Sequence, residues 1–248
     1  MRKPTLEQGK KMIKCVTFDL DDTLWAVNPV VRAANHTMYE WLAENAPLFN
    51  AMYTLRDLNQ LKQQVLTVQP EIGYSVTRIR LAVLELGLVN SGYSCDQASA
   101  LAEEGFKVFH QARQQVEFFE GALETIESLK ASGYIVGAIS NGNADIRHVG
   151  LSHCMDFQFS ADQVGVEKPD AEIFQQMLQY TGMYPHEVVH IGDHPEHDVL
   201  GAQQMGMRTI WVNLHGTLWG AGKAPDAEVR SLREIPDAIT MFGAAKRP

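Results

Sequence analysis

Short apolar segments alternate along this chain with longer segments that have helical spacing. Four of the apolar segments are partly β-branched and lie at residues 14–20, 134–140, 188–192 and 209–213. Such uninterrupted apolar runs are typical of strands that are buried on both faces of a parallel sheet. In the segments with helical spacing, apolar residues recur on one face at residues 121–132, 170–181 and 197–206. The alternation predicts an α/β fold with a doubly wound, Rossmann-like parallel sheet.

The stretch from residue 28 to residue 116 interrupts this alternation and has almost no strand signal. Its helical patterns cover residues 29–45, 54–68, 74–88 and 96–115. We therefore predict two parts. Residues 1–27 and 117–248 form the α/β core, and residues 28–116 form a helical subdomain inserted after the first strand.

Charge and cysteine content limit the classes of function. The chain has 21 basic and 30 acidic residues, a net charge of −9, which argues against nucleic acid as the main partner. No apolar run approaches the ~18–20 residues of a membrane span, and the first residues lack the apolar region of a signal peptide. Cys15, Cys95 and Cys154 are too few and too far apart for a disulfide framework. We expect a cytoplasmic protein, monomeric or homodimeric, with a poorly ordered arm at about residues 1–12.

Three carboxylates follow the first apolar segment within four positions, those of Asp19, Asp21 and Asp22. Like charges at this spacing repel one another, and burial adds a desolvation cost to each of them. A nearby cation must therefore compensate them, or one of them must hold a proton. Asp22 by itself fits an ordinary role near the start of a helix, where aspartate is common. The pattern as a whole indicates a site for chemistry.

Polar side chains also follow the later strands. Ser140, Asn141 and Gly142 end the second apolar segment, Asp193 and Asp198 follow the third, and Lys168 precedes the helix at 170–181. Ligands of open α/β sheets bind beyond the carboxyl ends of the strands. We therefore expect these hydroxyl, amide, ammonium and carboxylate groups to converge on one edge of the sheet.

This set of groups suits the hydrolysis of a phosphate ester. Asp19 can attack phosphorus to form an aspartyl-phosphate, and Asp21 can protonate the leaving alkoxide and later deprotonate the attacking water. Mg²⁺ is the expected cofactor because it prefers hard oxygen ligands, and Asp19 and Asp193 can supply two of them. Lys168 can hold the phosphoryl oxygens and relieve the repulsion. We expect Lys168→Ala to impair catalysis and to leave the fold intact.

The same residues resemble the motifs of the haloacid dehalogenase (HAD) superfamily of hydrolases, over about residues 14–215. The motif hhhDxDxT matches Asp19, Asp21 and Thr23, the strand-end serine matches Ser140, the lysine before a helix matches Lys168, and GDxxxxD matches Asp193 and Asp198. The resemblance implies a HAD core in which residues 28–116 are a C1 cap that closes over the site and selects the substrate.

The resemblance also implies a role for each matched residue. Asp19 would be the nucleophile and a Mg²⁺ ligand, and Asp21 would be the acid/base, with its backbone carbonyl on the same ion. Ser140 and Lys168 would hold the phosphoryl group, and we add the neighbouring Asn141 as a third phosphate-binding candidate. Asp193 would bind Mg²⁺, and Asp198 would support this metal site or bind the ion itself.

Substrate choice is expected to depend on the helices between residues 28 and 116. Arg78 and Arg80 are two positions apart on a predicted helix, so at most one of them points toward the sheet edge. Arg78 is our candidate substrate contact. The segments PEIGYSVTRIRL and ISNGN resemble bacterial phosphatases that act on flavin mononucleotide (FMN) and on 5-amino-6-(5-phosphoribitylamino)uracil. The predicted substrate is therefore a small phosphorylated metabolite of this kind.

Other functions on the same fold remain open. A haloacid dehalogenase would use Asp19 to displace halide without a metal, and Asp21 and Asp193 argue against it. A catalytically silent binding protein would be expected to have lost one of the motifs, and none is lost. A phosphomutase is not excluded by Asp21.

Four histidines crowd the region around the third strand: His186, His190, His194 and His197. They are distributed over a loop, a strand and a second loop, so they share no helical face that would suit zinc. We predict no dedicated zinc site and expect His194 and His197 at the entrance of the active site.

Overall fold

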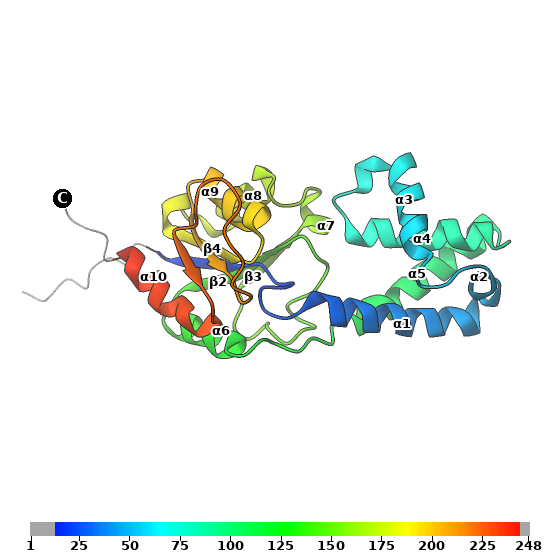
Figure 1. Cartoon of the computed structure of the whole chain (residues 1–248), viewed down its shortest axis with the longest axis horizontal. Helices are drawn as coiled ribbons and strands as arrows, with labels where there is room; N and C mark the ends of the chain where they lie inside the picture. Colours follow the sequence, from blue (N-terminus) through cyan, green and yellow to red (C-terminus); the bar gives the residue numbers. More distant parts are fainter. Residues whose placement is uncertain (1–12, 244–248) are drawn as a thin grey trace, which may run out of the picture.

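The computed structural model describes residues 13–243 of the chain. The arm predicted at residues 1–12 lies outside the described residues. Figure 1 shows a sheet flanked by helices at one end of the molecule and a group of further helices at the other end. None of the helices in the described part of the chain is both long enough and apolar enough to cross a membrane.

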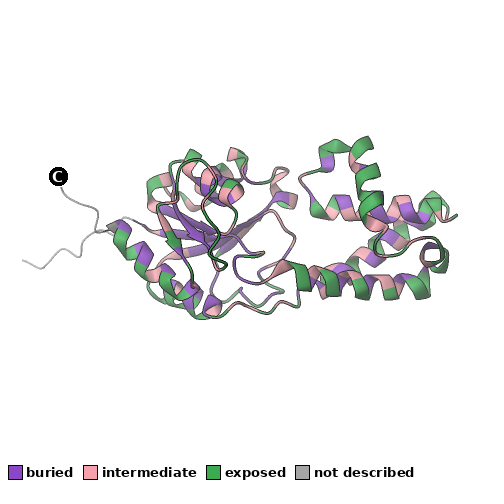
Figure 2. Ribbon diagram, in the orientation of Figure 1, coloured by how far each residue is buried: buried purple, intermediate pink, exposed green. Residues whose placement is uncertain are grey.

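The sheet has six parallel strands in the order β3-β2-β1-β4-β5-β6. They are β1 (Cys15–Phe18), β2 (Ile135–Ser140), β3 (Phe157–Ser160), β4 (Val188–Gly192), β5 (Arg208–Val212) and β6 (Ala227–Val229). The predicted α/β fold with a parallel sheet is confirmed. The four predicted strands correspond to β1, β2, β4 and β5, whose residues are almost all buried (Figure 2).

Helices cover both faces of the sheet. The helices of this part are α6 (Ala122–Ala131), α7 (Ala161–Val164), α8 (Ala171–Thr181), α9 (Gly201–Gln204) and α10 (Ile235–Gly243). Alternate strand residues face opposite sides: Val16 and Phe18 pack in the cluster that contains α6 and α10 residues, whereas Cys15 packs with α8 residues. In Figure 1, α6 and α10 accordingly lie on one side of the sheet, and α8 and α9 lie on the other.

The helix expected at residues 197–206 differs from the prediction. The chain forms a π-helical segment, Pro195–Leu200, and only then the short helix α9. Asp198 lies within the π-helical segment, where its backbone N–H donates to the His194 carbonyl four residues earlier. Its carboxylate accepts from the backbone N–H of His194, which turns the side chain back toward the end of β4. Short 3₁₀ turns elsewhere cover Pro70–Ile72, Pro185–Glu187 and Leu232–Glu234.

The segment between β1 and α6 contains five successive helices. They are α1 (Val27–Asn45), α2 (Pro47–Met52), α3 (Leu58–Val68), α4 (Val76–Asn90) and α5 (Cys95–Ala112). We refer to α1–α5 as the helical insertion. Two apolar clusters form within it and are separate from the clusters on the sheet, one around Met38, Leu42 and Phe109 and one around Leu61 and Val83. The helix α2 lies between the helices predicted at residues 29–45 and 54–68 and was not predicted itself. Pro47 occupies its first turn, where proline is tolerated.

The strand order places β1 at the point where the chain changes direction across the sheet. From β1 the chain proceeds to β2 and β3 on one side, and then to β4, β5 and β6 on the other side. Phe18 at the end of β1 lies in register with Ala138 of β2 and Ile191 of β4. The loops after β1, β2 and β4 therefore meet at one edge, which is where open α/β sheets bind ligands.

Candidate active site

A cavity of about 290 Å³ lies at the carboxyl ends of β1, β2 and β4. Most of the residues that line it are polar, and they come from both the core and the helical insertion: Asp19, Asp21, Asp22, Val27, Val76, Ser140, Asn141, Gly142, Lys168, Asp193, His194, His197 and Asp198. Nearly every site residue predicted from the sequence lines this single cavity; Arg78 is the exception.

Lys168 links two of the carboxylates in the floor of the cavity. Its Nζ donates to Asp19 Oδ1 at 2.7 Å and to Asp198 Oδ1 at 2.6 Å, and a third bond reaches the backbone carbonyl of Ile139 at 2.7 Å. The residue is only 1% exposed. Burial opposes its charge, but the carboxylates of Asp19 and Asp198 outweigh that effect and raise the pKa of Lys168. The ammonium group therefore remains charged and compensates part of the negative charge at the site.

Asp19 is held with its carboxylate facing the cavity. It directly follows β1, and its backbone N–H donates to the Ile191 carbonyl of the neighbouring strand at 2.8 Å. Burial raises the pKa of Asp19 well above its usual value, although Lys168 opposes the shift. Thr23 joins Asp19 to the end of β4, because its hydroxyl lies 3.4 Å from Asp19 Oδ2 and 3.1 Å from Asp193 Oδ1. It also accepts the backbone N–H of Asp193 at 3.0 Å.

The carboxylates of Asp19, Asp193 and Asp198 form a cluster that fits a divalent cation. One oxygen of each lies within 4.8 Å of the others. Burial, followed by repulsion from Asp198, raises the pKa of Asp193 to about 7. A bound cation would relieve this repulsion, and hard oxygen donors suit Mg²⁺. The residues present therefore fit the ion expected from the sequence.

Asp198 differs from the other two carboxylates because protein donors already occupy both of its oxygens. Its Oδ1 accepts from Lys168 and lies 3.2 Å from His190 Nε2, and its Oδ2 accepts the His194 N–H at 2.9 Å. Burial opposes ionisation, but Lys168 and His190 outweigh it and lower the pKa of Asp198. Gly192 lies so close to this carboxylate that a Cβ there would collide with it. Asp198 is thus placed to hold Lys168, leaving Asp19 and Asp193 as the carboxylates available to a metal.

Asp21 is held by two donors that the sequence analysis did not identify. Arg113, directly after α5, donates through Nη2 to Asp21 Oδ2 at 2.6 Å, and the indole N–H of Trp25 donates to Oδ1 at 2.8 Å. Arg113 is 1% exposed, and its Nε donates to Asn143 Oδ1 at 2.8 Å. Gly142 passes so close to the Asp21 carboxylate that any side chain there would collide with it. The predicted acid/base is therefore fixed by a residue at the end of the helical insertion.

Ser140 and Asn141 lie where the sequence predicted, at the end of β2. The Ser140 hydroxyl accepts the backbone N–H of Gly142 at 3.0 Å, which tightens the loop that follows the strand. The Asn141 side chain binds the backbone of Lys168 twice, donating to its carbonyl at 3.0 Å and accepting its N–H at 2.7 Å. In this structure Asn141 positions the Lys168 loop, and its role as a phosphate contact stays a prediction.

The structure does not bring Arg78 to the cavity. Arg78 is exposed on α4, and its guanidinium lies over the ring of Tyr74 at 5.6 Å from the ring centroid. His194 and His197 both line the cavity, with their rings stacked at 3.9 Å between centroids. Asp22 is exposed and accepts the backbone N–H of Val27 at 2.9 Å, the role expected near the start of a helix.

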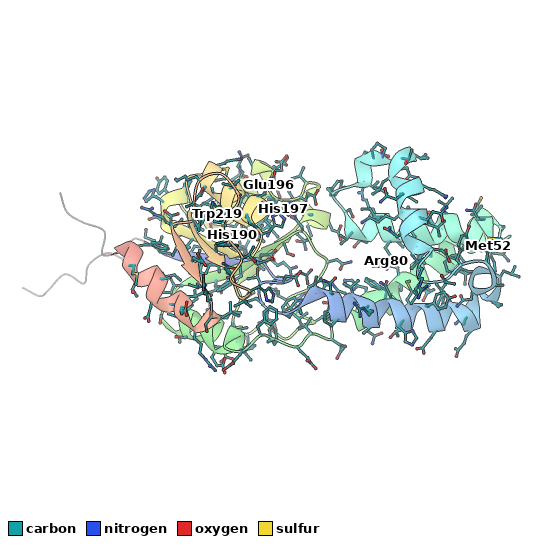
Figure 3. All side chains as sticks on the ribbon, viewed as in Figure 1. Met52, Arg80, His190, Glu196, His197 and Trp219 are labelled. Atoms are coloured by element: carbon teal, nitrogen blue, oxygen red, sulfur yellow. The ribbon has the colours of Figure 1, made fainter. Side chains whose placement is uncertain are left out.

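His190 lies on a strand, as expected from the sequence, but its contact with Asp198 was not predicted. It is buried in β4, with Nδ1 2.9 Å from the Thr17 hydroxyl and Nε2 directed at Asp198. Burial lowers the pKa of His190, so the imidazole is neutral and can donate a single hydrogen bond to the Asp198 carboxylate. His190 is buried and His197 is half-buried; Figure 3 labels both in the part of the molecule that contains the sheet.

Comparison with known proteins gives a consistent result. The model of the haloacid dehalogenase-like hydrolase family matches residues 13–206. The chain is 29% identical over 231 residues to the 5-amino-6-(5-phospho-D-ribitylamino)uracil phosphatase YigB of Escherichia coli. This match covers 92% of the chain and 96% of YigB. It is 25% identical over 232 residues to a glyceraldehyde 3-phosphate phosphatase of Methanopyrus kandleri, covering 91% and 92% of the two chains.

Among solved structures, a 2-haloacid dehalogenase from Pseudomonas syringae pv. Tomato is similar over nearly the whole chain. The TM-score is 0.88 at 39% sequence identity, and the match covers 93% of this chain and 100% of the dehalogenase. Proteins named as phosphatases and a protein named as a dehalogenase thus share this fold with the chain.

Proposed function

Because the chain belongs to the haloacid dehalogenase-like hydrolase family, we propose that it is a Mg²⁺-dependent phosphatase acting on a small phosphate ester. The observation that carries the proposal is the pair of carboxylates after β1. Asp19 lies at the cavity floor beside Lys168, and Asp21 is held two residues later as a separate carboxylate. A nucleophile and an acid/base at this spacing are what hydrolysis of an ester through an enzyme intermediate requires.

The reaction proceeds in two steps. Asp19 attacks phosphorus, the bond from phosphorus to the ester oxygen breaks, and Asp21 gives a proton to the leaving alkoxide. Asp21 then takes a proton from water as the water attacks the aspartyl-phosphate, which releases phosphate and restores the Asp19 carboxylate. Lys168 and Ser140 hold the phosphoryl oxygens, and Lys168 offsets their charge.

Mg²⁺, when bound, would neutralise charge on the phosphoryl oxygens and align the phosphate with the nucleophile. Asp19 and Asp193 would hold it with their carboxylates, and Asp21 with its backbone carbonyl. The helical insertion, joined to the core through Arg113 and Asp21, would act as the cap that closes over the site.

For the substrate we propose FMN or a phosphate of riboflavin synthesis. Support comes from the similarity to YigB, which extends over nearly the full length of both chains. We further propose a cytoplasmic location, because Cys15 and Cys154 are buried free thiols and Cys95 is an exposed one.

A second candidate function is dehalogenation of a 2-haloacid. The high TM-score with the Pseudomonas syringae dehalogenase favours it. Asp21 argues against it, because displacement of halide from carbon by Asp19 needs no proton donor for the leaving group, whereas an alkoxide does.

A panel of substrates separates the two functions. We expect phosphate release from para-nitrophenyl phosphate and FMN in the presence of Mg²⁺, its loss in a chelator, and no halide release from an (S)-2-haloacid. FMN is expected among the better substrates in a panel that includes glyceraldehyde 3-phosphate and phosphoserine. Undiminished phosphatase activity in a chelator would contradict the mechanism, and halide release without phosphate release would establish the dehalogenase.

Binding of Mg²⁺ is expected to stabilise the protein more at pH 8 than at pH 5.5. Because the pKa of Asp193 is raised to about 7, the folded protein binds a proton there more tightly than the unfolded chain does. The contribution of Asp193 to stability therefore falls as the pH rises from the pKa that this group has in the unfolded chain toward 7. Below pH 7, a cation must compete with the proton on Asp193. At a Mg²⁺ concentration of 100 times the Kd, the stabilisation is about 2.7 kcal/mol, or roughly 5–10 °C in Tm for a chain of this size.

Thermal unfolding with and without Mg²⁺ at the two pH values measures this difference. Asp193→Asn serves as the control and should lose most of the Mg²⁺-dependent shift at both values. An equal shift of the wild-type protein at pH 5.5 and pH 8 would contradict the assignment of Asp193 as a metal ligand.

A further inference from the structure

The helical insertion contains a second cavity, of about 300 Å³, between α1, α3 and α4. Apolar side chains such as Met38, Ile79 and Leu84 form most of its walls. Its polar groups are Asn35, Asn59, Lys62 and Arg80, which include two cations. Because no carboxylate lines it, the cavity combines an apolar interior with a positive charge. Such a combination is typical of a site for a largely apolar ligand that carries oxygen acceptors.

Arg80 is the notable cation of this cavity because acceptors of the protein bind only some of the N–H donors of its guanidinium. Its Nη1 donates to Asn35 Oδ1 at 2.6 Å, and its Cζ lies 3.4 Å from the centroid of the Phe109 ring. Within residues 13–243, Asn35 is its one hydrogen-bond partner, and no carboxylate forms an ion pair with it. Burial, followed by repulsion from Arg113, lowers the pKa of Arg80 to about 10, so the group is still charged at neutral pH. A half-buried cation without a counter-ion has donors to spare for a ligand.

Two observations connect this cavity to the active site. Val76, at the start of α4, lines both cavities. Arg113, whose charge contributes to lowering the pKa of Arg80, is the residue that binds Asp21. Figure 3 shows Arg80 in the half of the helical insertion nearer the sheet, whereas Met52 lies at the far end. A substrate with its phosphate at Asp19 could therefore extend past Val76 toward Arg80.

We propose that this second cavity binds the end of the substrate that is remote from the phosphate, and that Arg80 donates hydrogen bonds to carbonyl or carboxylate oxygens there. The inference rests on the proposed phosphatase function and narrows its substrate class. The favoured substrate is an extended phosphate monoester with oxygen acceptors at its far end. A three-carbon phosphate would fill the active-site cavity alone and gain nothing from Arg80.

The test compares Arg80→Met, which keeps an unbranched apolar stem and removes the charge, with Arg78→Met as the matched control. Arg78 is on the same helix, is exposed, and lines neither cavity. Three substrates are used: FMN, whose far end carries ring carbonyls; 6-phosphogluconate, whose far end carries a carboxylate; and para-nitrophenyl phosphate, which has neither. We expect Arg80→Met to lower kcat/KM for FMN, for 6-phosphogluconate or for both by about 10–100-fold, mainly through KM. Activity on para-nitrophenyl phosphate should stay within about twofold of the wild type, as should Arg78→Met on all three.

The two long substrates distinguish the acceptor: a loss confined to FMN assigns ring carbonyls, and a loss confined to 6-phosphogluconate assigns a carboxylate. Equal loss on all three substrates, or a selective loss in Arg78→Met instead, would overturn the proposal. Calorimetric binding of FMN to the wild type and to Arg80→Met keeps the test separate from catalysis. If no phosphate ester is hydrolysed, the proposed function fails, whereas equal FMN affinity of the two proteins contradicts the role of Arg80 by itself.

Discussion

Asp19→Asn is expected to abolish the hydrolysis of para-nitrophenyl phosphate, with kcat reduced on the order of 10⁴-fold or more, as when other enzymes lose their nucleophile. The amide has no charge with which to attack phosphorus, and it removes one of the two carboxylates available to the metal. The loss should not reflect unfolding. Burial raises the pKa of Asp19, so a neutral side chain at this position is no harder to bury than the carboxylate.

Asp22→Asn is the matched control for this experiment. Asp22 belongs to the same group of three carboxylates but is exposed and accepts the Val27 N–H, a bond that the asparagine carbonyl oxygen can also accept. Its φ of +60° is one that asparagine tolerates well. We expect this variant to keep near wild-type activity and an unchanged Tm. An active Asp19→Asn protein, or an Asp22→Asn protein as impaired as Asp19→Asn, would contradict the assignment of Asp19 as the nucleophile.

Most of the sheet could be predicted from the sequence because its central strands are buried on both faces. The strands β1, β2, β4 and β5 are near-continuous apolar runs. The edge strands are different: β3 reads FQFS, and β6 has only three residues, one of them the exposed Glu228. A short edge strand is held mainly by its neighbour, so its own residues carry little pattern.

The parts of the site that adjoin strand ends could also be predicted. Asp19, Ser140 and Asp193 follow their strands directly, so the parallel sheet alone brings them together. Arg113 could not be found in this way, because it lies 92 residues from Asp21 and reaches it only through the packing of the helical insertion on the core. His190 was visible in the sequence, but which face of β4 it occupies depends on the register with β1.

The choice between Arg78 and Arg80 also depended on packing that the sequence does not show. Residues two positions apart on a helix cannot share a face, so only one of the two arginines can point inward. The register of the helix decides which one does. The Ser75 side chain accepts the Arg78 N–H and so caps α4. With that start, Ile79 and Val83 face the interior, Arg80 lies over Phe109, and Arg78 is left exposed beside Tyr74.

Lys168→Met is expected to destabilise the protein as well as impair catalysis, which changes the expectation from the sequence that the fold would stay intact. The reason is burial: Lys168 is 1% exposed and is the cation between two buried carboxylates. Breaking a buried ion pair by removing one partner costs about 3–5 kcal/mol, because the other charge remains buried and unpaired. For a chain of this size that is a fall in Tm of roughly 6–20 °C. Measured in a chelator at pH 7.5, the free energy of unfolding should fall by this amount.

The pH dependence and a double variant separate this explanation from a simple packing defect. Lys168 lowers the pKa of Asp198 below its unfolded value, so in the wild type their pairing contributes its full stability at pH 7.5 and still at pH 4, and loses it only at lower pH. In Lys168→Met, burial raises the pKa of the Asp19 and Asp198 carboxyls without an opposing cation. These carboxylates then take up protons as the pH falls, so the deficit of the variant should shrink toward pH 4. Adding Asp198→Asn removes one unpaired charge and should recover part of the lost stability at pH 7.5, because the amide can still accept from the His194 N–H. A deficit that is the same at pH 4 and pH 7.5, and that Asp198→Asn only deepens, would mean that Lys168 stabilises the core through its methylene stem and not through its charge.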